Sequence, residues 1–502
     1  MHTDETGARS GALAVGLCIA FGIAIWLIAP ASNGEHFGGW SLLPAAVTIA
    51  ICFITRNVVI ALLAGVLTGG LVAHELNVIN TFLLPSLASE QFASQLLIYV
   101  WALGALLGLW NRNGGAVHFA RTIASRLVNS RRSAKLFTWG LGILFHQGGL
   151  ISTVIAGSTA RPVADEQGVA HEELSYIVDS TASPIATLIP FNGWPLYVSG
   201  LILLPSMAEP IPDMAAALAL FFKAIPYNFY AWIAVGMTLL FAFDKLPLFG
   251  TPMRKAVDRV TSTGELDRPG SMPMVSKELV SQPVHPDYPT TMLDFIAPIL
   301  VLLGFCIVPW VLGGEPWIFE AFGLAVLTSF GMTIWKGMPI NVVIEAALDG
   351  VKGVTVAALI LGLALSLATV AQHLGTSVYV VNATTPLLNQ APYVLPSLLL
   401  LVCMITSFSI GSSWGTYAVI FPIALPLAWA INPDESFLLL TFGSVMGGAL
   451  YGDQCSPVSD TTILSSLACG ADLMDHVVTQ LWLASMAAGL AAVLYLVAAL
   501  VI

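Results

Sequence analysis

The sequence predicts an all-α polytopic membrane protein with two inverted-topology repeats, in which re-entrant hairpins and broken helices meet at the membrane midplane. Three observations lead to this fold class: the apolar composition, polar breaks inside apolar segments, and a first half whose pattern recurs in the second half. Of the 502 residues, 57% are hydrophobic and 9% are charged, whereas soluble proteins carry about 25% charged residues. The composition therefore excludes an ordinary soluble domain, and no basic surface indicates nucleic-acid binding.

Changes in composition along the chain predict five parts. Apolar runs recur from residue 11 to residue 500, and several are short or interrupted. One long polar segment mixes basic residues with acids and prolines, which is typical of a linker between halves. The expected parts are N-terminal transmembrane helices over 1–93, a first inverted repeat over 94–243, a cytoplasmic linker over 244–291, connecting transmembrane helices over 292–353 and a second inverted repeat over 354–502.

The distribution of basic residues predicts how the chain crosses the membrane. Six basic residues lie within 112–135, whereas neither the corresponding stretch 372–393 nor any residue after Lys352 is Lys or Arg. Because cytoplasmic connections carry the excess of Lys and Arg, the two stretches are expected on opposite sides. The protein is thus predicted to be a multi-pass protein of the cell inner membrane, with its N-terminus in the cytoplasm.

The pattern of the first half recurs in register in the second. Ser152 and Pro162 match Ser412 and Pro422 at a separation of 260 residues. Such repeats are typical of secondary transporters, which bind solutes and coupling ions at the midplane among interrupted helices. Chance similarity between two apolar halves is the alternative, because apolar residues align easily.

The most polar break in an apolar region runs from Gly452 to Thr462. A charge at bilayer depth costs about 2.5–3.5 kcal/mol on insertion scales, so a carboxylate there predicts a cation or proton site. A loop rich in turn residues is the alternative. Asp453 and Asp460 are expected to bind Na⁺ or a proton, since oxygen ligands suit a hard cation. The residues expected to complete this site or form a second one are Ser456, Ser459, Thr461 and Thr462, with Asp179, Ser183 and Asn192 from the first half.

Two stretches rich in glycine and hydroxyl residues predict re-entrant hairpins that line a substrate pocket. Close helix packing is the alternative for their small residues. His146 could relay protons or simply be hydrogen-bonded, and Arg161 could hold a carboxylate or form an ion pair with Asp165 on the same helix. The predicted pocket residues are His146, Ser152, Thr153, Ser158, Arg161 and Trp194 in the first half, and Ser409, Ser412, Ser413, Trp414 and Thr416 in the second.

These motifs resemble those of the NhaC-type sodium/proton antiporter family. The resemblance rests on the Gly452–Thr462 stretch followed by Asp475-His476, on 411–416, and on 179–192. In better-known members the Gly-Asp-x-x-Ser-Pro signature lies in the first half, whereas here it lies in the second. The resemblance implies sodium/proton exchange or exchange of small organic acids.

We therefore expect a secondary active transporter that exchanges Na⁺ (or Li⁺) for H⁺ by alternating access. The alternative is a Na⁺- or H⁺-coupled carrier of a small organic acid or amino acid. Phosphate loops, hydrolytic triads and redox motifs are absent from the sequence, so neither an enzyme nor a primary pump is expected. The expected partners are membrane lipid and a small cation or organic solute; a monomer and a homodimer are both left open as alternatives. No cofactor is expected besides the transported or coupling ions Na⁺ and H⁺.

Overall fold

A computed structural model describes most of the chain. The residues outside the described part are 1–21, 31–33, 35, 56, 117, 120–121, 123–127, 147–148, 190–193, 204–206, 208–209, 248–249, 275–283, 312–316, 377, 380–381, 384–391 and 502. Within the described part the elements are helical, and one isolated β-bridge joins Pro273 to Asp472. The predicted all-α fold class is confirmed.

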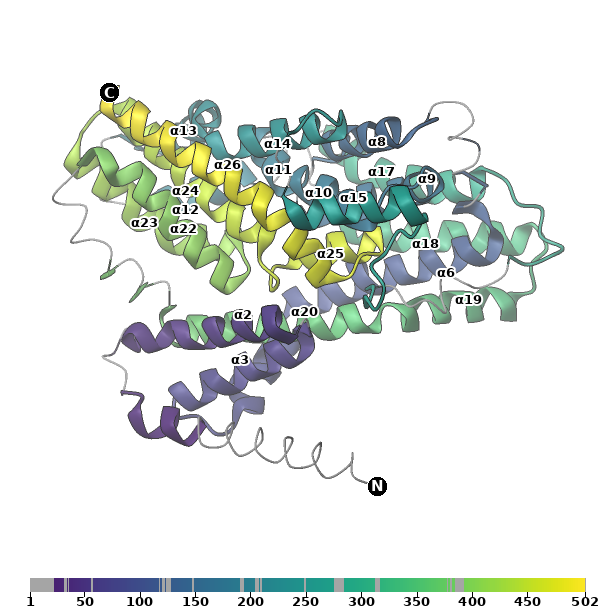
Figure 1. The fold of residues 1–502 in the computed structure, drawn as a ribbon, viewed down its shortest axis with the longest axis horizontal. Coiled ribbons are helices and arrows are strands. Elements are labelled where there is room, and N and C mark those ends of the chain that lie inside the picture. The colour runs from purple at the N-terminus through teal and green to yellow at the C-terminus, as the bar shows by residue number, and fades with distance from the viewer. Residues whose placement is uncertain are drawn as a thin grey trace.

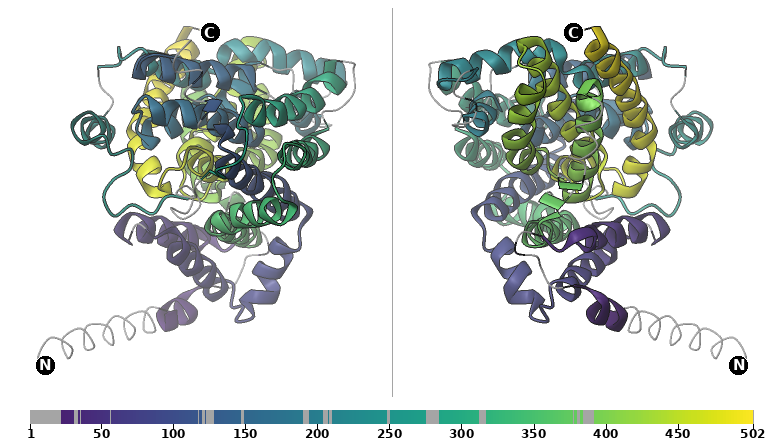
Figure 2. Two further views of the ribbon diagram at one scale, coloured as in Figure 1. Left: turned by 90° about the vertical axis from the view of Figure 1, so that its right-hand side faces the viewer. Right: turned by 90° about the vertical axis from the view of Figure 1, so that its left-hand side faces the viewer.

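One layer of helices contains most of the N-terminal region together with two helices from later in the chain. It lies along the lower side of the molecule in Figure 1, and both views in Figure 2 show α2 and α3 at this side. In this layer α2 packs on α3, α3 packs on α20, and α6 packs on α19. The bounds are α2 (Leu43–Thr55), α3 (Val58–Val72), α4 (Leu84–Leu87), α6 (Leu103–Asn113), α19 (Ile340–Gly353) and α20 (Thr355–His373).

The other helices form a larger bundle on the opposite side (Figure 1). Its first-half members are α8 (Arg131–Leu144), α9 (Gly149–Glu166), α10 (His171–Ser180), α11 (Ser183–Leu188), α12 (Trp194–Ile202), α13 (Met214–Ala224) and α14 (Phe229–Ala242). Those from the later part are α15 (Thr251–Thr263), α17 (Leu293–Val311), α18 (Ile318–Trp335), α22 (Leu395–Ile410), α23 (Ser413–Ile431), α24 (Glu435–Cys455), α25 (Asp460–Cys469) and α26 (Leu473–Val501).

Three described helices are long and apolar enough to cross a membrane, or up to five if each of two bent pairs is one span. The single spans are Gly38–Thr55, Ser413–Ile431 and Leu473–Val501. The bent pairs turn by 47° at Asn228 and by 41° between Gly353 and Ala358. Many predicted apolar runs therefore correspond to short or interrupted helices.

Both halves contain a helical hairpin followed by an interrupted helix. In the first half, α8 and α9 form the hairpin and the chain breaks again at 181–182, between α10 and α11. In the second half, α22 and α23 form the hairpin and the chain breaks at 456–459, between α24 and α25. Pro184 is the second residue of α11 and Pro457 lies within the second break, and a proline has no N–H to continue a helical hydrogen-bond ladder. These breaks are the ones that the sequence predicts.

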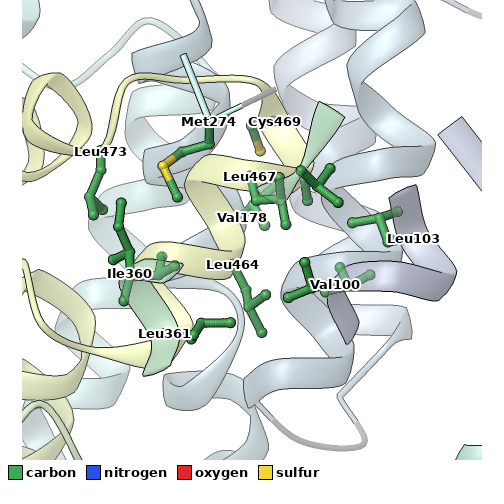
Figure 3. Close-up of a cluster of buried hydrophobic side chains, with 14 of the residues drawn as sticks. Val100, Leu103, Val178, Met274, Ile360, Leu361, Leu464, Leu467, Cys469 and Leu473 are labelled. Atoms are coloured by element: carbon green, nitrogen blue, oxygen red, sulfur yellow. The ribbon is translucent and has the colours of Figure 1, made fainter. Parts of the chain in front are cut away.

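The hydrophobic core links the two layers. Figure 3 shows buried side chains from α6, α10, α20 and α25 packed together, with Leu464 and Leu467 of α25 near the centre. Met274, which lies in the predicted linker after α15, joins the same cluster. Since α25 also packs on α9 and α26, this core fixes the position of the break before α25.

Candidate functional site

The carboxylate of Asp453 lies at the centre of a buried group of serine hydroxyls. The hydroxyls of Ser183 and Ser413 donate hydrogen bonds to its Oδ2 at 3.0 Å and 2.9 Å. The Ser459 hydroxyl donates to its Oδ1 at 2.9 Å. All four side chains are at most 3% exposed. The structure therefore joins Asp453, Ser183 and Ser459 as the sequence predicts, and adds Ser413 from the predicted substrate pocket.

The helix breaks explain why these serines meet. Ser413 is the first residue of α23 and Ser459 is the N-cap of α25. The N-terminus of a helix carries a partial positive charge, which favours a nearby carboxylate. The close approach of α24 to α22 also requires Gly452, since a Cβ there would clash with the backbone of Phe408. Both helix ends thus stabilise the buried negative charge of Asp453.

The backbone next to Asp453 is satisfied by threonines from α25. Thr462 donates to the carbonyls of both Asp453 and Gln454 at 3.0 Å, and Thr461 donates to that of Asp453 at 3.3 Å. These carbonyls end α24, where no further turn of helix offers them an N–H. The Ser456 hydroxyl donates to the Phe408 carbonyl at 2.6 Å instead of contacting Asp453.

Asp179 forms a second buried polar group beside the first. Its Oδ2 lies 3.1 Å from His476 Nε2 and accepts a hydrogen bond from Gln480 Nε2 at 3.0 Å. Gln480 Nε2 also donates to the Gln454 carbonyl at 2.5 Å, and the Gln454 amide donates to Ser180 at 2.7 Å. Gln454, the residue after Asp453, is therefore linked to Asp179 through Gln480 of α26.

The structure places Asp460 apart from the Asp453 group. Asp460 is partly buried and lines a cavity of about 520 Å³, together with Ser412 and Trp414 of the second hairpin. The sequence predicts one Na⁺ site that contains both aspartates. The structure divides them because Ser459 points to Asp453, whereas Asp460, the next residue, faces the cavity.

Most other predicted pocket residues form hydrogen bonds to the backbone of their own helices. Thr153, Ser158, Ser409 and Thr416 each donate to a carbonyl three or four residues earlier. Ser152 is fully buried, and among the described residues its hydroxyl has no hydrogen-bond partner. His146 Nδ1 lies 3.1 Å from the carbonyl of Ile143. These five hydroxyls and the imidazole do not line the cavity.

The last three predicted site residues are Arg161, Trp194 and Asn192. Arg161 forms an ion pair with Asp165, one turn along α9, at 3.6 Å, so the structure favours the ion-pair alternative over a pocket role. Trp194 packs against Trp414, with ring centroids 4.8 Å apart, so it supports the cavity wall from behind. Asn192 lies outside the described residues.

Sequence reasoning assigned no role to Gln454, His476 and Gln480, which hold the two carboxylates in one network. A usable signal was present, because His476 and Gln480 lie four residues apart on one face of the apolar helix α26. Polar residues inside an apolar span face the interior of the protein and predict a site. In the described part of the chain, no group of three His, Cys, Asp or Glu side chains could hold a metal ion.

The helical fold and the buried carboxylate between broken helices define a membrane transport protein. The sequence pattern that defines the Na⁺/H⁺ antiporter family matches residues 202–500, and the chain belongs to this family. It is a transporter of the cation/proton antiporter class, which confirms the resemblance seen in the sequence.

Comparisons with individual proteins give the extent of similarity. An uncharacterized protein of Haemophilus influenzae is 27% identical over 495 residues, which cover 91% of this chain and 90% of that protein. The Na(+)/H(+) antiporter NhaC of Alkalihalophilus pseudofirmus is 39% identical over 83 residues, 16% of this chain and 17% of that protein. A malate-2H(+)/Na(+)-lactate antiporter of Bacillus subtilis is 37% identical over 100 residues, 20% of each chain. The crystal structure of the Alcanivorax borkumensis YdaH transporter matches with a TM-score of 0.34 and 14% identity over 90% of this chain and 97% of that one.

Proposed function

We propose that this protein exchanges Na⁺ for H⁺ across the cell inner membrane by alternating access, with Asp453 as the shared binding group. The observation that carries the proposal is the buried Asp453 carboxylate with three serine hydroxyls on its two oxygens. A carboxylate and hydroxyls form an all-oxygen ligand set, which suits a hard cation.

The hydroxyls can serve both states of such a site. In the structure each serine donates its proton to the carboxylate, but a hydroxyl rotates freely and also has two lone pairs. On arrival of Na⁺, the hydroxyl protons of Ser183, Ser413 and Ser459 turn away and their oxygens face the cation. A proton on Asp453 removes the negative charge that the cation needs, so the two ions exclude each other.

The cavity lies beside this site, although Asp453 and its three serines do not line it. Ser412 and Asp460 line the cavity, and each is adjacent in sequence to a serine that contacts Asp453. We propose that a cation enters through this cavity and reaches Asp453 by movement of the hairpin tip and the start of α25. Closing the space between the two layers on one side and opening it on the other would give alternating access.

The alternative, transport of a small organic acid, receives no support from the cavity. The described residues that line it come from two stretches, 85–89 and 361–460, and none of them is basic. The sequence holds no Lys or Arg from 57 to 111 or from 353 to 502. An anion in this cavity would therefore meet the carboxylate of Asp460 and no basic side chain among the described lining residues, which is unfavourable in a region of low dielectric.

The test is Na⁺ binding to the purified protein as a function of pH. We expect the apparent Na⁺ affinity to fall about tenfold for each pH unit where Asp453 is mostly protonated, since one proton competes with one cation. Asp453→Asn removes the charge with little change of shape and should abolish both Na⁺ binding and its pH dependence. Asp258→Asn, at an exposed position in α15, is the matched control and should behave like the wild type. Unchanged, pH-dependent binding in Asp453→Asn would move the site away from Asp453.

A further inference from the structure

The cavity beside Asp460 is larger than a bare inorganic cation needs. Its volume is about 520 Å³, which lies within the range of about 300–1,000 Å³ that is typical of sites for small organic molecules. Its lining residues come from the 85–89 segment, α20, the end of α22, the start of α23 and the region where α25 begins; Figure 1 labels these four helices. A site for Na⁺ alone would require only the few oxygen atoms around Asp453.

The charge of the cavity has a single sign. Asp460 is the one ionisable side chain among the described lining residues. As shown above, the two stretches of sequence that supply the lining contain no Lys or Arg. A cavity lined by one sign of charge with low-dielectric walls concentrates ions of the opposite sign. Such a cavity favours a cation over an anion.

The rest of the lining suits an organic cation. Trp414 is 42% exposed at the wall, although Tyr197 and Trp194 pack against its ring with centroids 4.2 Å and 4.8 Å away. Aromatic rings attract ammonium and guanidinium groups that lie over their faces. Tyr197 also donates a hydrogen bond to the Trp414 carbonyl at 2.9 Å, which fixes this part of the hairpin. Acceptors for N–H donors are available on Ser86, Ser89, Thr369, Gln372 and Ser412.

We infer that this cavity binds a small organic cation, with its ammonium or guanidinium group at Asp460 and Trp414 and its apolar part along α20. Leu361, Ala364, Leu365 and Ala368 supply the apolar wall on α20. The inference rests on the proposed function in one respect: it places the organic cation on the path by which Na⁺ reaches Asp453. Because Asp460 is the neighbour of Ser459, which contacts Asp453, the two positive charges would lie close together in a region of low dielectric, and their repulsion weakens the binding of each.

The experiment uses three probes of equal chain length and different charge: n-butylammonium, n-butanol and butyrate. Binding of each to the purified full-length protein is measured by calorimetry, and Na⁺ binding is measured on the same preparation. We expect n-butylammonium to bind and to weaken Na⁺ binding, and we expect no binding of butyrate. Equal binding of butyrate and n-butylammonium would overturn the inference, as would n-butylammonium binding that leaves Na⁺ affinity unchanged.

Two variants locate the site, and both are compared with Asp258→Asn. Asp460→Asn should weaken n-butylammonium binding at least about tenfold, because it removes the one charge among the described lining residues. Trp414→Leu should weaken it about threefold to tenfold while sparing the carboxylates. Retention of wild-type affinity by both folded variants would overturn the inference.

The Na⁺ measurements separate this inference from the proposed function. Na⁺ binding that depends on Asp453, without any binding of n-butylammonium, would refute the organic-cation site and leave Na⁺/H⁺ exchange standing. Binding of n-butylammonium that depends on Asp460, without any Na⁺ binding, would keep the cation cavity and overturn both the exchange of Na⁺ and the competition.

Discussion

Gly411 sets the geometry of the second hairpin tip at the scale of a single residue. Its φ of +68° lies in the left-handed region, which glycine adopts readily and other residues rarely do. A Cβ at this position would also clash with the carbonyl of Val458, in the break before α25. Ser413 and Ser459, which contact Asp453, are within two residues of these contacting positions. The Asp453 site thus depends on Gly411, although Gly411 itself offers no side chain as a ligand.

Gly411→Ala is expected to weaken Na⁺ binding by about tenfold or more. A left-handed alanine costs about 1–2 kcal/mol, which the Na⁺-free protein relieves if the tip shifts. Restoring the binding geometry then costs that energy, and about 1.4 kcal/mol corresponds to a factor of ten in affinity. The clash with Val458 adds to this cost and moves the two serines apart. Gly264→Ala is the matched control, because Gly264 has a similar φ of +76° but open space around an added Cβ. Na⁺ affinity measured on both variants decides the point, and equal affinities would show that the hairpin tip tolerates movement.

The predicted linker contains an element that holds the two halves of the bundle together. Its helix α15 places Arg259 against Glu172 of α10, with two hydrogen bonds of 3.0 Å and 2.7 Å. The following segment places Arg268 on Asp475 of α26 at 3.0 Å and Asp267 on the His171 ring at 2.8 Å. The sequence predicts this segment as a linker, and the structure adds that it connects α10 to α26.

The contact between His171 and the linker should depend on pH, because its imidazole and the carboxylate of Asp267 both titrate. Burial by itself lowers the pKa of His171, where α10 begins beside the linker, but the carboxylates of Asp165 and Asp267 outweigh burial and raise it to about 9. Burial raises the pKa of Asp267, and the His171 contact outweighs this and lowers it. A raised histidine pKa contributes stability that is complete below the unfolded pKa of about 6.5 and is lost as pH rises through about 9.

His171→Gln should therefore remove a pH-dependent part of the stability. In the wild type, the free energy of unfolding should fall as pH rises from about 7 to about 10, by an amount on the order of 3 kcal/mol at most. In His171→Gln this fall should be much smaller, since glutamine does not titrate. Thermal unfolding of detergent-purified protein across this pH range measures the effect, with His118→Gln at an exposed position as the control. A fall of equal size in wild type and His171→Gln would assign it to other groups.

For the whole molecule, local sequence patterns predict the helices and the places where they break. Apolar composition, Pro184 and Pro457 are features of short segments, so they can be recognised without knowing the fold. For the same reason Asp179 and Asp453 stand out as carboxylates in apolar surroundings.

The partners of these carboxylates depend on the fold instead. Ser183 meets Asp453 across 270 residues of sequence, and Gln480 meets Asp179 across 301. No local pattern indicates which of many hydroxyls will lie within 3 Å of a carboxylate. Ser459 and Asp460 likewise point in different directions because α25 begins between them. Sequence patterns do not place a helix end to within one residue.

The orientation of the two repeats across the membrane is a property of the whole chain, and it stays a prediction. It rests on charge, since 112–135 carries six basic residues and 372–393 carries none. Basic connections stay on the cytoplasmic side during insertion, so the start of each hairpin should face a different side of the membrane. Asn129, two residues before α8, and Tyr393, two residues before α22, are exposed positions at the starts of the two hairpins.

Cysteine labelling at these two positions tests the orientation. In a variant with its native cysteines replaced by serine, Asn129→Cys should react with an impermeant maleimide only in inverted membrane vesicles. Tyr393→Cys should react in intact cells, or in spheroplasts where an outer membrane blocks the reagent, because no positive charge retains its connection in the cytoplasm. The cysteine-free variant is the control for background labelling, and its Na⁺ binding shows that it is folded. Reaction of both positions from the same side would mean that the two hairpins enter the membrane in the same direction, and the inverted repeat would then be wrong.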